Sequence, residues 1–232
     1  MSDYVFVLPS GENVPVVITA RRGAHNITLR PKCFPQRMIC ITRPWLVSDR
    51  CAIKFLESKR LWVLGVFQKT PCKIMLQDGD EIDFLGRKML LKHCPNLRSN
   101  KLSDDASILY VGGSADMFQR RIRDFVKSEL LREIKDIMHN VPNEFLPHRI
   151  ALRDTVSRWG SCSTSGTMSF SWRLAFAPYD VMRYVVMHEL AHTKHMNHSP
   201  EFWATVRDLY GSGVERAKRW LKQNGASLHR YF

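Results

Sequence analysis

The chain has 232 residues, of which 44% are hydrophobic and 25% charged, as in an ordinary globular protein. This length is enough for one large domain or two small ones with a buried core. No run approaches the roughly 18 apolar residues that a membrane helix needs, and the N-terminus lacks the pattern of a secretory signal. We therefore expect a cytoplasmic protein with no membrane partner.

The chain is strongly basic, with a formal net charge of +13 and a pI of about 9.7. Such a charge attracts polyanions in a salt-dependent way. The basic residues are spread along the sequence rather than gathered in one run. An anionic partner, such as nucleic acid or a nucleotide, and a merely solvated basic surface therefore both remain open.

The six cysteines lie at wide spacings, with no CxxC pair among them. This pattern is typical neither of a disulfide scaffold nor of a cysteine zinc site, so we expect reduced thiols. The cysteines are Cys33, Cys40, Cys51, Cys72, Cys94 and Cys162.

The first half of the chain predicts a β-rich region with one helix. Residues 3–45 alternate and are rich in β-branched residues, which predicts short antiparallel strands. Ser48 is placed to cap a single helix. We expect its apolar face to carry Ile53, Leu56, Trp62, Val63 and Phe67.

Residues 73–91 predict a β-hairpin, because Asp78-Gly79 stands between two apolar runs. Residues 95–106 are polar and predict a loop, and residues 108–111 predict one more strand before Gly112-Gly113. We therefore expect a β-rich N-terminal region over residues 1–113.

The second half, residues 114–232, predicts a mainly helical domain, which makes the fold α+β. A long helix should begin at Ser114 and stop before Pro142. Residues 149–163 and 168–176 predict the two strands of a hairpin. Three further helices are expected: one from Pro178 through His192, one from Ser199-Pro200 and one over residues 214–221.

His188-Glu189-Leu190-Ala191-His192 lies within one of these predicted helices. Residues four apart share a helix face, so both imidazoles can bind one Zn²⁺ ion. The intervening Glu189 does not ligate the metal and can act as general base toward a water molecule. His198 follows His192 by six positions, the spacing of longer zinc signatures, and supplies a third ligand. Three protein ligands leave a position open, as a catalytic zinc requires.

One position departs from the usual zinc signature. Where such sites often have glycine three residues after the second histidine, this chain has His195. We expect the chain to turn instead at Asn197, which tolerates positive φ. His195 itself is a competing ligand, a transition-state stabiliser or an exposed cation at a helix end.

Three segments in order resemble the YgjP-like metallopeptidases, relatives of the SprT-type zinc peptidases. They are Arg158–Ser163 (RWGSCS), Tyr184–His192 (YVVMHELAH) and Asn197–Trp203 (NHSPEFW). The resemblance implies a bacterial, cytoplasmic zinc hydrolase with a zincin-like, small gluzincin-like core. It implies one zinc held by His188, His192 and His198, with Glu189 as the catalytic acid and base.

The strand before the active-site helix is a candidate wall of a substrate cleft. In zinc peptidases an edge strand beside the metal pairs with an extended substrate. The cleft candidates are Arg158, Gly160, Ser161 and His195. A purely structural turn, with Trp159 as core, Gly160 as a bulge and Cys162 as buried filler, is equally compatible with the residues.

The reaction predicted is hydrolysis of a peptide bond, by a metalloendopeptidase. Two other functions remain open. A water activated beside basic residues could attack a phosphoanhydride, although the chain has no glycine-rich phosphate loop and no acidic cluster for Mg²⁺. A nucleic-acid-associated protein with the same zinc site would explain the charge but gives Glu189 no role. Three imidazoles also accept divalent ions other than zinc.

Overall fold

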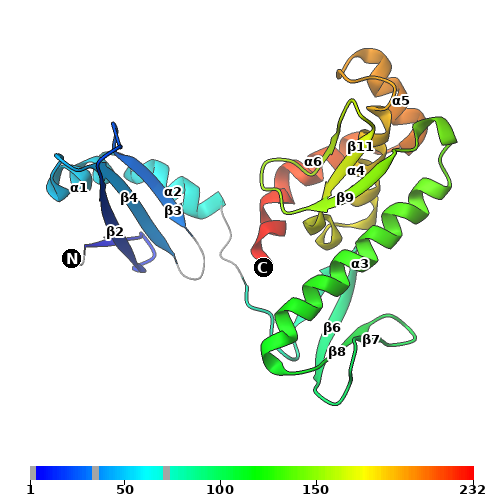
Figure 1. Ribbon diagram of the computed structural model, residues 1–232, viewed down its shortest axis with the longest axis horizontal. Helices are drawn as coiled ribbons and strands as arrows, with labels where there is room; N and C mark the ends of the chain where they lie inside the picture. Colours follow the sequence, from blue (N-terminus) through cyan, green and yellow to red (C-terminus); the bar gives the residue numbers. More distant parts are fainter. Residues whose placement is uncertain (1–3, 33–36, 70–73) are drawn as a thin grey trace. The chain divides into compact units, whose positions relative to one another are not determined.

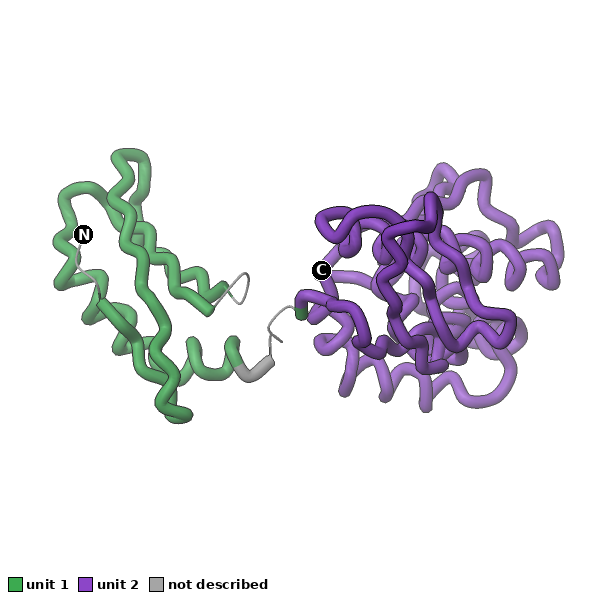
Figure 2. Tube along the Cα trace, turned by 90° about the horizontal axis from the view of Figure 1, so that it is seen from below, with its two compact units in different colours: residues 1–74 green, residues 75–232 purple. Residues whose placement is uncertain are grey.

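The computed structural model describes residues 4–32, 37–69 and 74–232. By its internal contacts the chain forms two compact units, residues 1–74 and residues 75–232 (Figure 2). Each unit has its own hydrophobic core. We expected a division near residue 113, but residues such as Leu91 and Val111 belong to the core of the second unit.

The first unit contains a four-stranded sheet in the order β1-β2-β4-β3. The expectation of antiparallel strands holds for the β1–β2 and β3–β4 pairs, but the central pair, β2 and β4, is parallel. The sheet is mixed because β3 takes the edge position and the chain returns between β2 and β3 as β4. Alternation predicts strands but not their neighbours. The strands are β1 (Val5–Val7), β2 (Asn13–Arg21), β3 (Thr28–Lys32) and β4 (Met38–Pro44).

Two helices, rather than the single one expected, cover one face of this sheet (Figure 1). They are α1 (Asp49–Ser58) and α2 (Arg60–Lys69). The Ser48 side chain caps α1 by accepting a hydrogen bond from the Cys51 N–H, 3.4 Å away. Leu56, Val63 and Phe67 are buried as predicted, whereas Trp62 is 51% exposed. The break at Lys59 turns α2 so that Trp62 leaves the apolar face.

The second unit begins with another mixed sheet, in the order β5-β6-β8-β7. The expected hairpin is present, but its turn is Leu85-Gly86 and not Asp78-Gly79. Both turn residues have positive φ, as a two-residue hairpin loop requires. The predicted loop over residues 95–106 includes the short strand β7. The strands are β5 (Glu81–Phe84), β6 (Arg87–Cys94), β7 (Lys101–Leu102) and β8 (Ile108–Gly112).

A long helix and a third sheet follow. After a 3₁₀ turn at Ala115–Met117, α3 spans Phe118–His139, close to the helix predicted. The strand expected over residues 149–163 is two strands, because the chain leaves the ladder after Arg153. The sheet order is β10-β11-β9, with β10 and β11 antiparallel and β9 and β11 parallel. The strands are β9 (Arg149–Arg153), β10 (Gly160–Cys162) and β11 (Thr167–Ser171).

The last three helices are α4 (Tyr179–Ala191), α5 (Pro200–Tyr210) and α6 (Val214–Asn224), at the positions predicted. α4 is central: most of its side chains are buried. The segment that leads into α4 is tied to the β5–β6 turn, where the Leu85 N–H donates to the Ala175 carbonyl 2.7 Å away. Among the described residues no helix is long and apolar enough to cross a membrane.

Candidate metal centre

The C-terminal end of α4 carries the three central residues of the site. Apolar side chains on the other faces of α4, such as Val185, Val186 and Leu190, fix the helix in the core. His188 and Glu189 lie within the last turns, and His192 is the first residue beyond the helix. The rigid, buried helix therefore holds two imidazoles and a carboxylate at one end of the core.

The three predicted histidines come together. One ring nitrogen from each of His188, His192 and His198 lies within 4.8 Å of the others. The Nε2 atoms of His188 and His198 are 3.2 Å apart. Convergent imidazole nitrogens are a donor set that suits zinc and related divalent ions. His195 does not join the group.

The remaining nitrogens of the two α4-derived imidazoles contact acceptors outside the cluster. His192 Nδ1 lies 2.9 Å from the His195 carbonyl oxygen, and His188 Nδ1 lies 3.5 Å from the Tyr184 hydroxyl. When Nδ1 carries the proton and donates it outward, Nε2 is left with a lone pair facing the cluster. His195 thus supports the site through its main chain.

Burial favours the neutral form of these imidazoles. It lowers the pKa of His188 to about 4, with smaller effects from the charges of His192 and His198. Burial also lowers the pKa of His192. Neutral imidazole is the form that ligates metal ions.

The segment that carries His198 turns without a left-handed residue. The described non-glycine residues with positive φ are Leu85, Ala106 and Phe232, so Asn197 does not adopt the positive φ expected of it, although the chain bends at residues 196–197. The helix end instead tightens through short-range bonds, such as Thr193 N–H to the Leu190 carbonyl at 3.0 Å. Ser199 then caps α5 by accepting from the Phe202 N–H at 3.4 Å, which anchors the chain just after His198.

Aromatic rings from α5 hold His198, the most exposed of the three histidines. Phe202 is fully buried and meets the His198 ring edge-on, with centroids 4.8 Å apart. The Trp203 ring is tilted by 34° to the His198 ring, with the ring centres 5.9 Å apart. Lys218 of α6 places its ammonium 4.3 Å from the Trp203 ring centre. Lys218 was not predicted from the sequence, since no local pattern links a lysine on one helix to a ligand two elements earlier.

Glu189 is only 5% exposed. Burial raises the pKa of its carboxyl group to about 7, and the positive charge of Arg158 acts in the opposite direction. The main chain of β10 passes directly against this carboxylate: a Cβ at Gly160 would lie 2.6 Å from Glu189 Cγ and 2.7 Å from Cδ.

The other cleft candidates lie along or next to β10. Gly160, Ser161 and Cys162 pair regularly with β11, so Gly160 is not a bulge. Trp159 is partly buried against the core, and burial, with the Glu189 charge, raises the pKa of the Cys162 thiol. The free cysteines among the described residues, Cys162 included, form no disulfide. Arg158 and Gly160 therefore lie beside Glu189, whereas His195 lies beyond His192.

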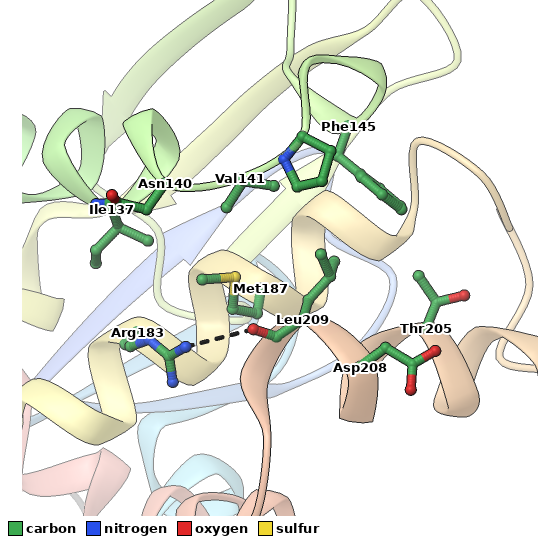
Figure 3. Close-up of a pocket in the computed structure, with 10 residues that line it drawn as sticks. Ile137, Asn140, Val141, Phe145, Arg183, Met187, Thr205, Asp208 and Leu209 are labelled. Carbon is green, nitrogen blue, oxygen red and sulfur yellow. Dashed lines mark hydrogen bonds between the residues drawn. The ribbon is translucent and has the colours of Figure 1, made fainter.

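A separate cavity of about 510 Å³ lies on a neighbouring face of α4 (Figure 3). Arg183 and Met187 of α4 line it together with residues of α5 and of the segment after α3. Arg183 donates to the carbonyls of Tyr210 and Leu209, at 2.8 and 3.3 Å. None of the three clustered histidines lines this cavity.

Comparison with known proteins assigns the family. The family model described as YgjP-like, metallopeptidase domain, matches residues 25–224. No curated protein matches the chain. A similar solved structure is the metallopeptidase zymogen of Pyrococcus abyssi abylysin, which is 25% identical to this chain. The match covers 46% of this chain and 98% of the abylysin chain, with a TM-score of 0.33. The chain belongs to the YgjP-like metallopeptidase family.

Proposed function

We propose that this protein is a zinc-dependent metalloendopeptidase with a zincin-like core over the second unit. In this proposal His188, His192 and His198 hold one zinc ion through Nε2. Glu189 is the general base. The observation that carries the proposal is the convergence of three imidazole nitrogens within 4.8 Å beside a buried carboxylate.

A zinc ion bound there would act as a Lewis acid, polarising the scissile carbonyl and acidifying water. The protein's own contribution is proton transfer and orientation. Glu189 accepts the proton of the attacking water and returns it to the leaving amine. Its position against β10 gives the carboxylate little room to rotate away.

The edge of β10 is the proposed binding site for the peptide. In the described part of the chain β10 pairs with β11 on one side only, so its other edge can add an extended substrate strand. Main-chain hydrogen bonds of this kind recognise a peptide without reading its sequence. Arg158, exposed and close enough to Glu189 to affect its pKa, is the proposed anchor for a substrate carbonyl or carboxylate.

Glu189→Gln tests the role of the carboxylate. The amide cannot accept the proton, so we expect zinc content near that of the unaltered protein and a loss of about 10²–10⁴ in kcat on a casein-derived peptide. Metal analysis and peptide cleavage are measured on the same preparation. His198→Ala is the companion variant and should lose the zinc as well as the activity.

A fully active Glu189→Gln protein would exclude Glu189 as the base. Nucleoside triphosphates are assayed in parallel with the peptide. Metal-dependent release of phosphate or pyrophosphate without peptide cleavage would contradict the peptidase and favour a nucleotide hydrolase.

A further inference from the structure

The first unit is much more basic than the rest of the protein. Residues 1–74 contain twelve Lys and Arg and only four Asp and Glu, so about a third of the chain carries +8 of the total +13. The residues proposed for the metal centre all belong to the second unit. The charge is therefore a property that the proposed peptidase function leaves unexplained.

The three acidic residues that the structure describes in this unit are each neutralised locally. Glu12 pairs with Arg37 and Asp49 with Arg43, both at 2.5 Å, and Glu57 pairs with Arg60 at 3.0 Å. The other described cations of the unit have no described carboxylate within ion-pair distance, Arg21, Arg22, Arg30 and Lys32 among them. Their positive potential is consequently not cancelled nearby.

One face of the β1–β4 sheet carries several of these cations. The opposite face is buried against α1 and α2 through residues such as Ile39 and Ile41. Alternation along the strands directs Arg21, Arg30 and Lys32 to the other side, which we call the outer face. All three are exposed, and α1 and α2 both pack on the opposite face of the sheet (Figure 1).

The other side chains of the outer face are uncharged. In register, Arg30 lies opposite Cys40, and Cys40 lies opposite Val17; the next row is Thr28, Thr42 and Thr19. None of the strands β1–β4 contains an acidic residue. The outer face is thus basic along β3 and at the end of β2, with threonine hydroxyl groups between Arg30 and Arg21. It also carries the exposed side chains of Val5, Val7 and Val17.

An aromatic residue directly follows the end of this sheet. The parallel strands β2 and β4 finish side by side, with Arg21 opposite Pro44, and the chain continues from Pro44 into Trp45. Trp45 is 55% exposed, and the Arg22 guanidinium lies 5.6 Å from its ring centre. An exposed tryptophan next to arginines is a platform on which a nucleic-acid base can stack.

We propose that the outer face and Trp45 bind a single strand of nucleic acid. Arg21, Arg30 and Lys32 contact the phosphates, and Trp45, with Arg22 beside it, stacks on a base. A duplex keeps its bases stacked on one another and would make no use of Trp45. An acidic peptide would satisfy the cations but has no planar base for the tryptophan. The inference does not depend on the proposed peptidase activity.

Fluorescence anisotropy of the full chain with a labelled 20-nucleotide mixed-sequence single strand tests the proposal, over a series of salt concentrations. Arg21→Gln/Arg30→Gln/Lys32→Gln removes the charges and keeps the aliphatic stems. Losing three phosphate contacts should weaken binding and flatten the slope of log K against log [salt] by about 2. Trp45→Ala should weaken binding about tenfold and leave the slope unchanged.

The matched control is Arg207→Gln/Arg219→Gln/Lys222→Gln. Like the outer-face variant, it replaces two arginines and one lysine, here at exposed positions of the second unit. Circular dichroism and thermal unfolding of each variant confirm that it is folded. Equal weakening by the control and the outer-face variant would overturn the proposal.

Two other probes separate the alternatives. The same sequence as a duplex, bound as tightly as the single strand and indifferent to Trp45→Ala, would contradict the stacking role. A poly-glutamate peptide that binds as tightly as the oligonucleotide would show that the face recognises acidic protein segments instead. Preference for the single strand, lost with Trp45, supports the proposal.

Discussion

Position 160 must be glycine because β10 runs directly against the Glu189 carboxylate. A methyl group there would lie 2.6 Å from Glu189 Cγ, well inside van der Waals contact. The backbone of β10 is held by its ladder with β11, so the glutamate side chain is the part that has to move. The site therefore depends on a missing side chain as much as on those present.

Gly160→Ala should separate metal binding from turnover. We expect zinc to remain bound, because the three histidines are untouched. We expect kcat/KM on a peptide to fall about 10²-fold, the typical cost of displacing a catalytic group by about 1 Å.

Gly65→Ala is the matched control for Gly160→Ala. No atom outside its own helix lies within 4 Å of the place that a Cβ would take at Gly65, and in a helix the change should stabilise by about 1 kcal/mol. Full activity of Gly160→Ala would show that turnover does not depend on the position in which β10 holds the Glu189 carboxylate.

The helices α5 and α6 act together on the one ligand that α4 does not supply. His198 stands on the segment between α4 and α5, and the rings of Phe202 and Trp203 set its orientation. Lys218 of α6 lies over the Trp203 ring, an arrangement that cation–π attraction stabilises. Residues of α5 and α6 thus hold the His198 side chain, which the segment between α4 and α5 leaves exposed.

Trp203→Ala should therefore weaken zinc binding, by about 10–100-fold, the usual effect of losing a residue that orients a ligand. Competition with a chromophoric chelator measures the affinity. Trp203→Phe keeps a ring and should recover much of the loss. His195→Ala is the control, since His195 contacts His192 through its carbonyl group, which the substitution leaves in place. Unchanged affinity in Trp203→Ala would mean that the loop alone positions His198.

Local patterns predicted the elements and the histidine cluster well. Two histidines four apart on a helix share a face whatever the rest of the chain does, and the cap at Ser199 is likewise a local feature. Features that depend on residues far apart in the sequence could not be predicted from local patterns. The parallel pairing of β2 with β4, the division of residues 149–163 into β9 and β10, and the Lys218 contact all depend on distant segments.

The hairpin turn shows how two local signals compete. Asp78-Gly79 and Leu85-Gly86 both lie between apolar runs, and only the first has the residue pair typical of such turns. Leu85 accepts a positive φ, at 49°, where its N–H reaches the Ala175 carbonyl. A tertiary contact therefore determines the turn position against local preference.

At the scale of the whole molecule, the two hydrophobic cores share no residue. One core comprises buried residues between Phe6 and Phe67, and the other comprises buried residues between Leu76 and Tyr231. Calorimetry of the full chain should resolve two transitions, because separate cores unfold as separate cooperative units. Only the transition of the second unit should depend on metal.

Removing zinc with a chelator should lower that transition by about 10 °C, since an ion present at about 1,000 times its Kd stabilises the folded state by about 4 kcal/mol. Leu56→Ala identifies the other transition. It empties a fully buried position of the first unit and should cost about 2–5 kcal/mol there alone. A chelator effect on both transitions would contradict a metal centre confined to one unit.

The contact between Leu85 and Ala175 also bears on the order in which the protein folds as it is synthesised. The first unit can close its core once α2 has left the ribosome, with no need for later residues. The β5–β6 hairpin emerges next, yet its turn gains its partner only when Ala175 appears, immediately ahead of α4. The hairpin turn therefore acquires this hydrogen bond only when the segment that leads directly into the histidine-bearing helix has been synthesised.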